Sequence, residues 1–177
     1  MIYIALGANL PSRFGTPRQT LKQAIAAIEK RVGRVIRQSA IYLTAPVPMS
    51  DQPWFHNAVI EVQSALSPEE MLKALHAIES DFGRVRSYQN APRIIDLDIL
   101  DYNYLVSDLK ELQLPHPRMT GRAFVLYPLG DIAPDWCHPV TGNTINDLMN
   151  QLPDDQKIIR DHSPEIMGVI NVTPDSF

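Results

Sequence analysis

Cysteine is nearly absent from this sequence, in which Cys137 is the single thiol among 177 residues. One cysteine cannot close an internal disulfide or supply a zinc site built on several thiolates, so we expect folding in a reducing compartment, the cytoplasm. No apolar run approaches the ~20 residues that a membrane helix needs. The opening residues, MIYIALGANL, lack the basic leader of a secretory signal peptide. We therefore expect neither secretion nor a membrane partner.

Two common nucleotide-binding motifs are also missing, the P-loop pattern GxxxxGK and the dinucleotide-binding pattern GxGxxG. The formal net charge of −4 argues against a nucleic-acid partner. An anionic substrate would therefore need a local basic cluster, and the stretch between residues 84 and 122 supplies one. It contains six of the 16 lysines and arginines, namely Arg84, Arg86, Arg93, Lys110, Arg118 and Arg122.

The order of the expected elements indicates an α+β fold. Thr16-Pro17 and Ser67-Pro68 each combine an N-cap with proline at the first helical position, and apolar residues at helical spacing follow as far as Gly33 and Gly83. With the strands, the order is βαββαβ, which is typical of a ferredoxin-like core, an antiparallel-rich sheet with helices packed on it. The expected strands span 2–6, 35–43, 54–62 and 94–103, and two further helices span 122–129 and 144–152.

Two acids, Asp96 and Asp98, interrupt the apolar run of the expected strand 94–103. Strand side chains alternate between faces, so both carboxylates point the same way, with Cα atoms roughly 6.5–7 Å apart. Unpaired acids are costly in such a run, although a solvated strand face is the simplest alternative. Carboxylates at this spacing can hold one or two hard cations that clamp a phosphate. The pair therefore predicts a candidate phosphoryl-transfer site.

The loop Gly83 to Arg93 brings Arg84, Arg86 and Arg93 next to the acids. Guanidinium groups bind phosphate bidentately, so this loop could neutralise a polyphosphate and close as a lid. A solvated basic loop is an equally good interpretation of these residues alone. Arg93 has the opposite strand parity to Asp96, so it can join the acids only if the regular strand begins after it.

Phe55 and Asn57 share one face of the expected strand 54–62, and Phe124 could add a second aromatic face. An aromatic ring can stack on a flat heterocycle while an amide reads its edge, although a core phenylalanine is the commoner role. His76 and Glu79 lie three residues apart on a helix and could contact a base, or form an exposed polar pair.

Together, these motifs resemble the 6-hydroxymethyl-7,8-dihydropterin pyrophosphokinases of the folate pathway. The resemblance runs from residue 2 to about residue 150. The matching stretches are Leu6-Gly7-Ala8-Asn9, Gln52-Pro53 with Phe55 and Asn57, Gly83-Arg84-Val85-Arg86, Pro92-Arg93-Ile94-Ile95-Asp96-Leu97-Asp98-Ile99, Pro115-His116-Pro117-Arg118-Met119 and Arg122-Ala123-Phe124-Val125-Leu126.

The resemblance implies transfer of pyrophosphate from ATP to the pterin hydroxymethyl oxygen, with release of AMP. It implies that Asp96 and Asp98 hold two Mg²⁺ ions and that Arg84 and Arg93 stabilise the transferred group. The implied ATP-binding residues are His76, Glu79, Arg86, Ile99, His116, Arg118 and Arg122. The implied pterin-binding residues are Gly7, Thr44, Ala45, Val47, Phe55, Asn57 and Phe124.

The last residues resemble a second family. Residues 165–177, EIMGVINVTPDSF, are similar to the opening strand and first loop of dihydropteroate synthase, a (β/α)₈ barrel. We interpret residues 1–152 as the pyrophosphokinase domain, 153–164 as a linker, and 165–177 as the start of a second enzyme cut short. The resemblance thus implies a covalent fusion. A ferredoxin-like module that binds ATP or pterin without catalysis is the alternative.

Overall fold

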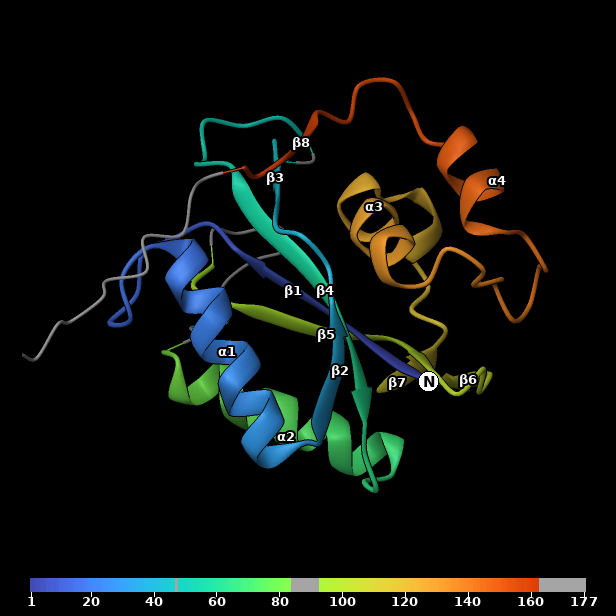
Figure 1. Ribbon diagram of the computed structural model, residues 1–177, viewed down its shortest axis with the longest axis horizontal. Coiled ribbons are helices and arrows are strands. Elements are labelled where there is room, and N and C mark those ends of the chain that lie inside the picture. The colour runs from blue at the N-terminus through green and yellow to red at the C-terminus, as the bar shows by residue number, and fades with distance from the viewer. Residues whose placement is uncertain (47, 84–92, 163–177) are drawn as a thin grey trace, which may run out of the picture.

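The computed structural model describes residues 1–46, 48–83 and 93–162 (Figure 1). Thirteen elements are assigned within these residues, eight of them strands. The strands are β1 (Ile2–Ala8), β2 (Arg34–Gln38), β3 (Tyr42–Thr44), β4 (Phe55–Gln63), β5 (Asp96–Tyr102), β6 (Ser107–Leu109), β7 (Leu112–Leu114) and β8 (Ile158–Arg160). The helices are α1 (Pro17–Arg31), α2 (Pro68–Asp81), the 3-10 turn η1 (Met119–Gly121), α3 (Ala123–Ile132) and α4 (Ile145–Asn150).

The main sheet has the ferredoxin-like strand order. Its path is β5-β1-β4-β3-β8, and β2 pairs with β4 on the same side as β3. All of these pairings are antiparallel. The predicted βαββαβ core is therefore confirmed, and its two central strands are β1 and β4.

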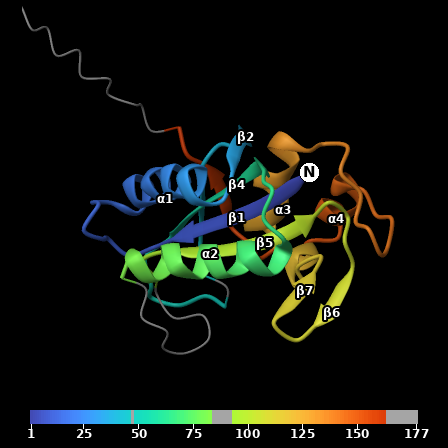
Figure 2. The same ribbon diagram turned by 90° about the horizontal axis from the view of Figure 1, so that it is seen from below.

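Helices cover both faces of this sheet. Figures 1 and 2 place α1 and α2 against one face and α3 against the other, with α4 packed beside α3. On β1 the faces alternate, because Ile4 packs in the cluster with α1 and α2, whereas Tyr3 packs in the cluster with α3 and α4. The two apolar clusters therefore pack on opposite faces of one sheet. The candidate site lies on the face toward α3.

Both long helices begin where the sequence predicts. Thr16 with Gln19 and Ser67 with Glu70 form complete capping boxes, each with proline in the first turn. After α1, a Cβ on Gly33 would lie 2.3 Å from the carbonyl oxygen of Gln63, so only glycine permits this approach to β4. Within the described residues, no helix has both the length and the apolar character to cross a membrane.

Three features differ from the expectation. The strand expected at 35–43 is split, because pairing with β4 breaks between Gln38 and Tyr42 and leaves β2 and β3 as separate ladders. The hairpin of β6 and β7 was not expected, since its strands are too short to show alternation. Finally, β8 lies inside the segment interpreted as a linker, 153–164, and pairs with β3. The expected second-enzyme segment, 165–177, lies outside the described residues.

Candidate functional site

A cavity of about 290 Å³ opens on the sheet face that carries α3. It lies over the ends of β1, β4 and β5, where the cluster packed against α3 and α4 stops. Its walls come from the three strands, from the segment after β3 and from the start of α3. The lining residues are Ala5, Leu6, Gly7, Thr44, Ala45, Pro46, Pro48, Ser50, Gln52, Phe55, Asn57, Arg93, Asp96, Asp98, Leu100, His116, Arg122, Phe124 and Val125.

The floor of the cavity is a row of residues that are neighbours across the strands. Gly7 of β1 is paired with Asp96 of β5 on one side and with Asn57 of β4 on the other. Adjacent strands lie about 4.8 Å apart, so the row places a carboxylate and an amide on either side of a residue without a side chain. A Cβ on Gly7 would lie 3.0 Å from Asn57 Oδ1. The missing side chain therefore makes room in the cavity floor.

Asn57 is held in place by its neighbour on β3. Its Nδ2 donates to Thr44 Oγ1 over 2.8 Å, and both side chains are buried. Phe55 and Phe124 are half-buried and line the same cavity from β4 and from the first turn of α3. A fixed amide in a cavity that two aromatic rings also line suits a flat heterocycle, because the rings can stack on its faces while the amide contacts its edge.

The acid pair lies at the other end of the row. Asp96 and Asp98 are half-buried and line the cavity together, as strand parity predicts. β5 begins at Asp96, so Arg93 precedes the regular strand and its guanidinium forms an ion pair with the Asp96 carboxylate. The condition set by strand parity for Arg93 is therefore met.

Asn9 fixes the backbone of Arg93. Its Oδ1 accepts from the Arg93 N–H over 2.8 Å, and its own N–H donates to the Arg93 carbonyl over 3.1 Å. Its Nδ2 donates to the Pro53 carbonyl over 3.1 Å, which ties the same residue to the segment before β4. Asn9 belongs to the motif Leu6-Gly7-Ala8-Asn9, but no strand periodicity indicates its contact with Arg93.

His116 and Arg122 complete the cavity wall beside the acids. Burial, followed by the charges of Arg122 and Arg118, lowers the pKa of His116 to about 4. Its Nδ1 accepts from the Arg118 N–H over 3.2 Å, so the neutral imidazole carries its proton on Nε2. Burial, with Arg118 nearby, also lowers the pKa of Arg122. The guanidinium of Arg122 lies 5.3 Å from the centroid of the Phe124 ring.

A second, more open cavity meets the first beside Asp98. Asp98 and His116 line both cavities. Ile99 and Arg118, expected at the nucleotide, line this second cavity, whereas Arg122 lines the first. Its other walls come from α2, from the β6–β7 hairpin and from the segment after β7, through Leu72, Lys110, Glu111, Leu112, Gln113, Leu114 and Pro117.

The two carboxylates fit a Mg²⁺ site that is completed by a ligand. Magnesium is usually bound by one or two protein carboxylates together with substrate phosphates and waters. Asp96 and Asp98 match this set, because they share one face of β5, both line the first cavity, and Asp98 also lines the second. Among the described residues, no group of three or more His, Cys, Asp or Glu side chains could hold a metal ion without further ligands.

The remaining predicted residues either do not line the two cavities or fall outside the described residues. Glu79 is buried, and its Oε1 accepts from the Leu97 N–H over 2.8 Å, so it supports β5 from beneath. His76 is exposed on α2. Neither residue lines the two cavities above. Val47, Arg84 and Arg86 fall outside the described residues.

Comparison with known proteins identifies a matching family. The family model described as 7,8-dihydro-6-hydroxymethylpterin-pyrophosphokinase matches residues 3–134. The chain is 40% identical over 153 residues to a 2-amino-4-hydroxy-6-hydroxymethyldihydropteridine pyrophosphokinase of Pseudomonas aeruginosa, covering 86% of this chain and 91% of that protein. It is 34% identical to the "Folate synthesis bifunctional protein, mitochondrial" of Arabidopsis thaliana, covering 99% of this chain and 36% of that protein.

Solved structures show the same fold. The crystal structure of wild-type Plasmodium falciparum HPPK-DHPS superposes with a TM-score of 0.67 at 18% identity, covering 84% of this chain and 44% of that chain. The chain spans only 25% to 36% of the length of several folate-synthesis relatives that it matches. All lining residues of the two cavities lie within residues 3–134, the part that the family model matches.

Proposed function

The chain belongs to the 7,8-dihydro-6-hydroxymethylpterin-pyrophosphokinase family, and from this premise we propose the reaction that its two joined cavities perform. The hydroxymethyl oxygen of 6-hydroxymethyl-7,8-dihydropterin attacks the β-phosphorus of ATP. The bond from the β-phosphorus to the oxygen that bridges to the α-phosphorus breaks, and AMP leaves with that oxygen. The hydroxyl proton is released, and the product is the pterin diphosphate.

One observation carries this proposal: Asp98 and His116 border both cavities. A two-substrate transfer needs the acceptor and the donor to meet at the reacting phosphorus. Pterin in the first cavity and nucleotide in the second would meet beside Asp98. Holding both reactants in this geometry supplies much of the catalysis, since phosphoryl transfer depends mainly on positioning and charge neutralisation.

Asp96 and Asp98 would hold Mg²⁺, which when bound neutralises phosphate charge and orients the transferred group. We propose two such ions, following the family resemblance. Arg93 stands beside Asp96 and can pair with a phosphate oxygen, while neutral His116 can donate a hydrogen bond through Nε2. Arg84 would act with Arg93, and Arg86 with the nucleotide, as the resemblance implies.

The first cavity accounts for recognition of the pterin. Phe55 and Phe124 would stack on its two faces, and Asn57 would contact its edge. Thr44 and Ala45 line the wall beside Asn57, and Thr44 also fixes the amide of Asn57. Gly7 leaves the floor open, because a side chain at this position would meet Asn57. Val47 is proposed as a further contact on the basis of the resemblance.

Product identity tests the proposed reaction directly. The protein is mixed with ATP, Mg²⁺ and 6-hydroxymethyl-7,8-dihydropterin, and nucleotides and phosphates are followed by ³¹P NMR and chromatography. We expect AMP and pterin diphosphate in equal amounts, and no turnover in excess EDTA. ADP would indicate ordinary phosphoryl transfer, and inorganic pyrophosphate would indicate nucleotidyl transfer. Either product would overturn the proposal.

Tight binding of both ligands without any product would support the alternative, a non-catalytic binding module. Calorimetry with ATP and pterin in parallel with the product assay separates the two functions. The acid pair favours the enzyme, because a module that only binds has no need of two carboxylates beside the phosphate site.

We propose that residues 165–177 begin a dihydropteroate synthase domain in a bifunctional parent. The alignment with the bifunctional Arabidopsis relative extends over 99% of this chain, well beyond the pyrophosphokinase family model. Activity of the parent with p-aminobenzoate and pterin diphosphate would test this.

The single cysteine favours a reducing compartment, and we propose the cytoplasm, to be checked by imaging the tagged parent protein.

A further inference from the structure

The segment that follows α4 reaches both walls of the first cavity. Residues 156–161, which we call the strap, include β8 and pair with the outer edge of β3. In Figure 1 the chain passes from α4 above α3 to β8, which lies beside β3. The strap itself contributes no lining residue. Its contacts with the lining segments therefore indicate support rather than ligand contact.

Gln156 holds the α3 wall. Arg122, the N-cap of α3, makes no side-chain capping hydrogen bond, so the first N–H groups of this helix need another acceptor. Gln156 Oε1 accepts from the Ala123 N–H over 2.8 Å, and its Nε2 donates to the Gly121 carbonyl over 2.8 Å. Gln156 thus caps the start of α3 at Ala123, the residue before Phe124, although it lies 33 residues away in the sequence.

The next residue holds the opposite segment. The carbonyl of Lys157 accepts from the Ala45 N–H over 3.2 Å, and Thr44 is paired with Ile158 in the β3–β8 ladder. Thr44 in turn accepts from Asn57. Two consecutive residues of the strap therefore connect the helix that carries Phe124 to the segment that positions Asn57.

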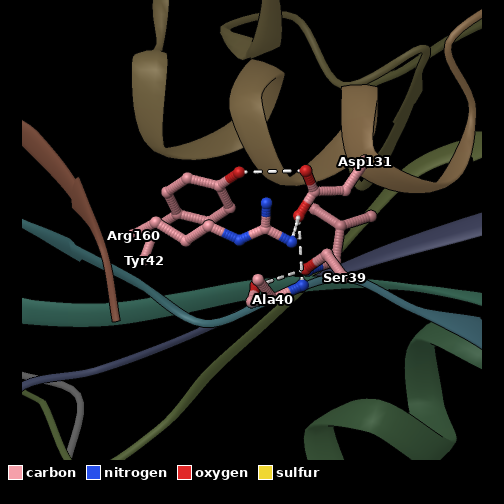
Figure 3. Close-up of polar contacts among 6 residues, drawn as sticks. Ser39, Ala40, Tyr42, Asp131 and Arg160 are labelled. Carbon is pink, nitrogen blue, oxygen red and sulfur yellow. Dashed lines mark hydrogen bonds and ion pairs between the residues drawn. The ribbon is translucent and has the colours of Figure 1, made fainter. Parts of the chain in front are cut away.

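The far end of the strap is also fastened. Figure 3 shows Arg160 and Tyr42 extending toward Asp131 near the end of α3, with Asp131 also accepting from the Ala40 N–H. Asp131 Oδ1 accepts from the Tyr42 hydroxyl over 3.0 Å, and Asp131 Oδ2 lies 3.7 Å from Arg160. The N–H of Asp161 donates to the Ile41 carbonyl over 2.8 Å. The strap is thus tied to β3 and α3 at both ends.

We propose that the strap sets the separation of the two pterin-binding walls and that Gln156 is a positioning residue for pterin. The inference rests on the proposed function, because it assumes that pterin lies between Phe55 and Phe124. It assigns a role in the pyrophosphokinase reaction to the segment that sequence patterning placed in a linker. In a bifunctional parent, the chain that leads to the second enzyme would therefore continue from the strap.

The test compares Gln156→Leu with Gln151→Leu, the same change at an exposed glutamine of the same region. Pterin affinity is measured by calorimetry with Mg²⁺ and α,β-methylene-ATP, an analogue that cannot undergo the transfer, and kinetics are measured with ATP. We expect Gln156→Leu to raise the pterin Kd and KM about 3- to 10-fold, as the loss of one or two hydrogen bonds predicts. The ATP KM and kcat stay within about twofold, and Gln151→Leu matches the unmodified protein.

Two further measurements separate positioning from general stability. Gln156→Glu keeps an acceptor for the Ala123 N–H but cannot donate to Gly121, so we expect a smaller rise in pterin Kd. This variant decides the question if Gln156→Leu does not fold. Amide hydrogen exchange at Ala123 should accelerate in Gln156→Leu without ligand.

An unchanged pterin Kd in Gln156→Leu together with a lower Tm would overturn the inference, since Gln156 would then only stabilise the fold. Equal loss of ATP and pterin affinity would overturn it as well. If the unmodified protein binds pterin but forms no AMP, the proposed reaction fails, while the pterin titrations still decide the role of Gln156. An unmodified protein that binds no pterin overturns both.

Discussion

The two faces of the sheet use the same strands for opposite purposes. On the face toward α1 and α2, β1 contributes Ile2, Ile4 and Leu6, all buried in one continuous apolar cluster. On the other face the same strand contributes Tyr3, then Ala5, then Gly7. The side chains on this face of β1 become smaller from Tyr3 to Gly7. Tyr3 packs in the cluster with α3, whereas Ala5 and Gly7 line the cavity.

The neighbouring strands change in the same direction. On β5 the second face runs from Leu100 in the core to Asp98 and Asp96 in the cavity, and on β4 it runs from Val59 to Asn57. One face is therefore filled along its length to stabilise the fold, and the other is filled only halfway. The difference suggests that stability and function can be altered separately, one on each face.

The largest expected effect is on activity and concerns the sheet face that carries the cavity. Asp96→Asn keeps the shape but removes a negative charge needed to hold Mg²⁺, so we expect turnover to fall by about 10³-fold. The Tm should change little, because Asp96 is half-buried at a strand end. AMP release and thermal unfolding are measured on the same preparation. Asp108→Asn, at an exposed acid on β6, is the control, and near-normal turnover of Asp96→Asn would refute the metal assignment.

The matching change on the closed face should affect stability instead. Leu75 of α2 is fully buried in the cluster with β1, so Leu75→Ala should lower the free energy of unfolding by about 2–5 kcal/mol. Urea denaturation measures this loss. Turnover per folded molecule should stay within about twofold at low temperature. A large fall in kcat in the folded variant would show that the two faces are not independent.

A smaller effect is expected at the boundary between core and cavity. Gly7→Ala would place a Cβ about 3.0 Å from Asn57 Oδ1 and displace the amide that contacts the pterin. We expect the pterin KM to rise about tenfold, equivalent to about 1.4 kcal/mol, with little change in the ATP KM. Gly121→Ala is the control, because a Cβ there meets nothing within 4 Å. Equal pterin KM values for the two variants would contradict the proposed cavity floor.

The last expected effect is a pH dependence of stability at His116. Its pKa in the folded protein is lowered to about 4 from the ordinary 6.5 by burial and by Arg122 and Arg118. The unfolded chain therefore takes up a proton first as the pH falls, so this stabilising contribution is complete above about 6.5 and is lost between 6.5 and 4. NMR titration should show no protonation of this imidazole at pH 5.5 in the folded protein.

Unfolding of His116→Asn at pH 7 and pH 5 gives the matching stability measurement. The variant should lose less stability over this range than the unmodified protein, because it lacks the titrating group. A normal imidazole titration near pH 6.5 would show that His116 is not held neutral by the cavity wall.

Local patterns were sufficient for most of the fold. The capping boxes at Thr16 and Ser67 predict the starts of α1 and α2, because the side chains that satisfy these helix ends are close in sequence. The break between β2 and β3, the short hairpin of β6 and β7 and the pairing of β8 were not predicted. Three-residue strands show no periodicity, and their partners are chosen across the sheet.

The candidate site divides in the same way. Strand parity alone predicts that Asp96 and Asp98 share a face, since alternation is a property of any extended chain. Parity could only state a condition for Arg93, and the start of β5 at Asp96 satisfies it. The anchoring of Arg93 by Asn9 and the support of α3 by Gln156 join residues far apart in sequence.

Short stretches of sequence predicted the α+β class, the two long helices and the shared face of the acid pair, because each depends on residues close together in the chain. The resemblance to the pyrophosphokinases rests on motifs that are each local, although they are spread from residue 2 to about residue 150. Tertiary structure alone decided which residues meet. Register placed Gly7 between Asp96 and Asn57, and the β6–β7 hairpin supplies walls of the second cavity, which meets the first at Asp98. Pairing of β8 with β3 attached the segment interpreted as a linker to the edge of the sheet, next to residues that line the first cavity. These contacts depend on how strands and helices dock, which no local pattern encodes.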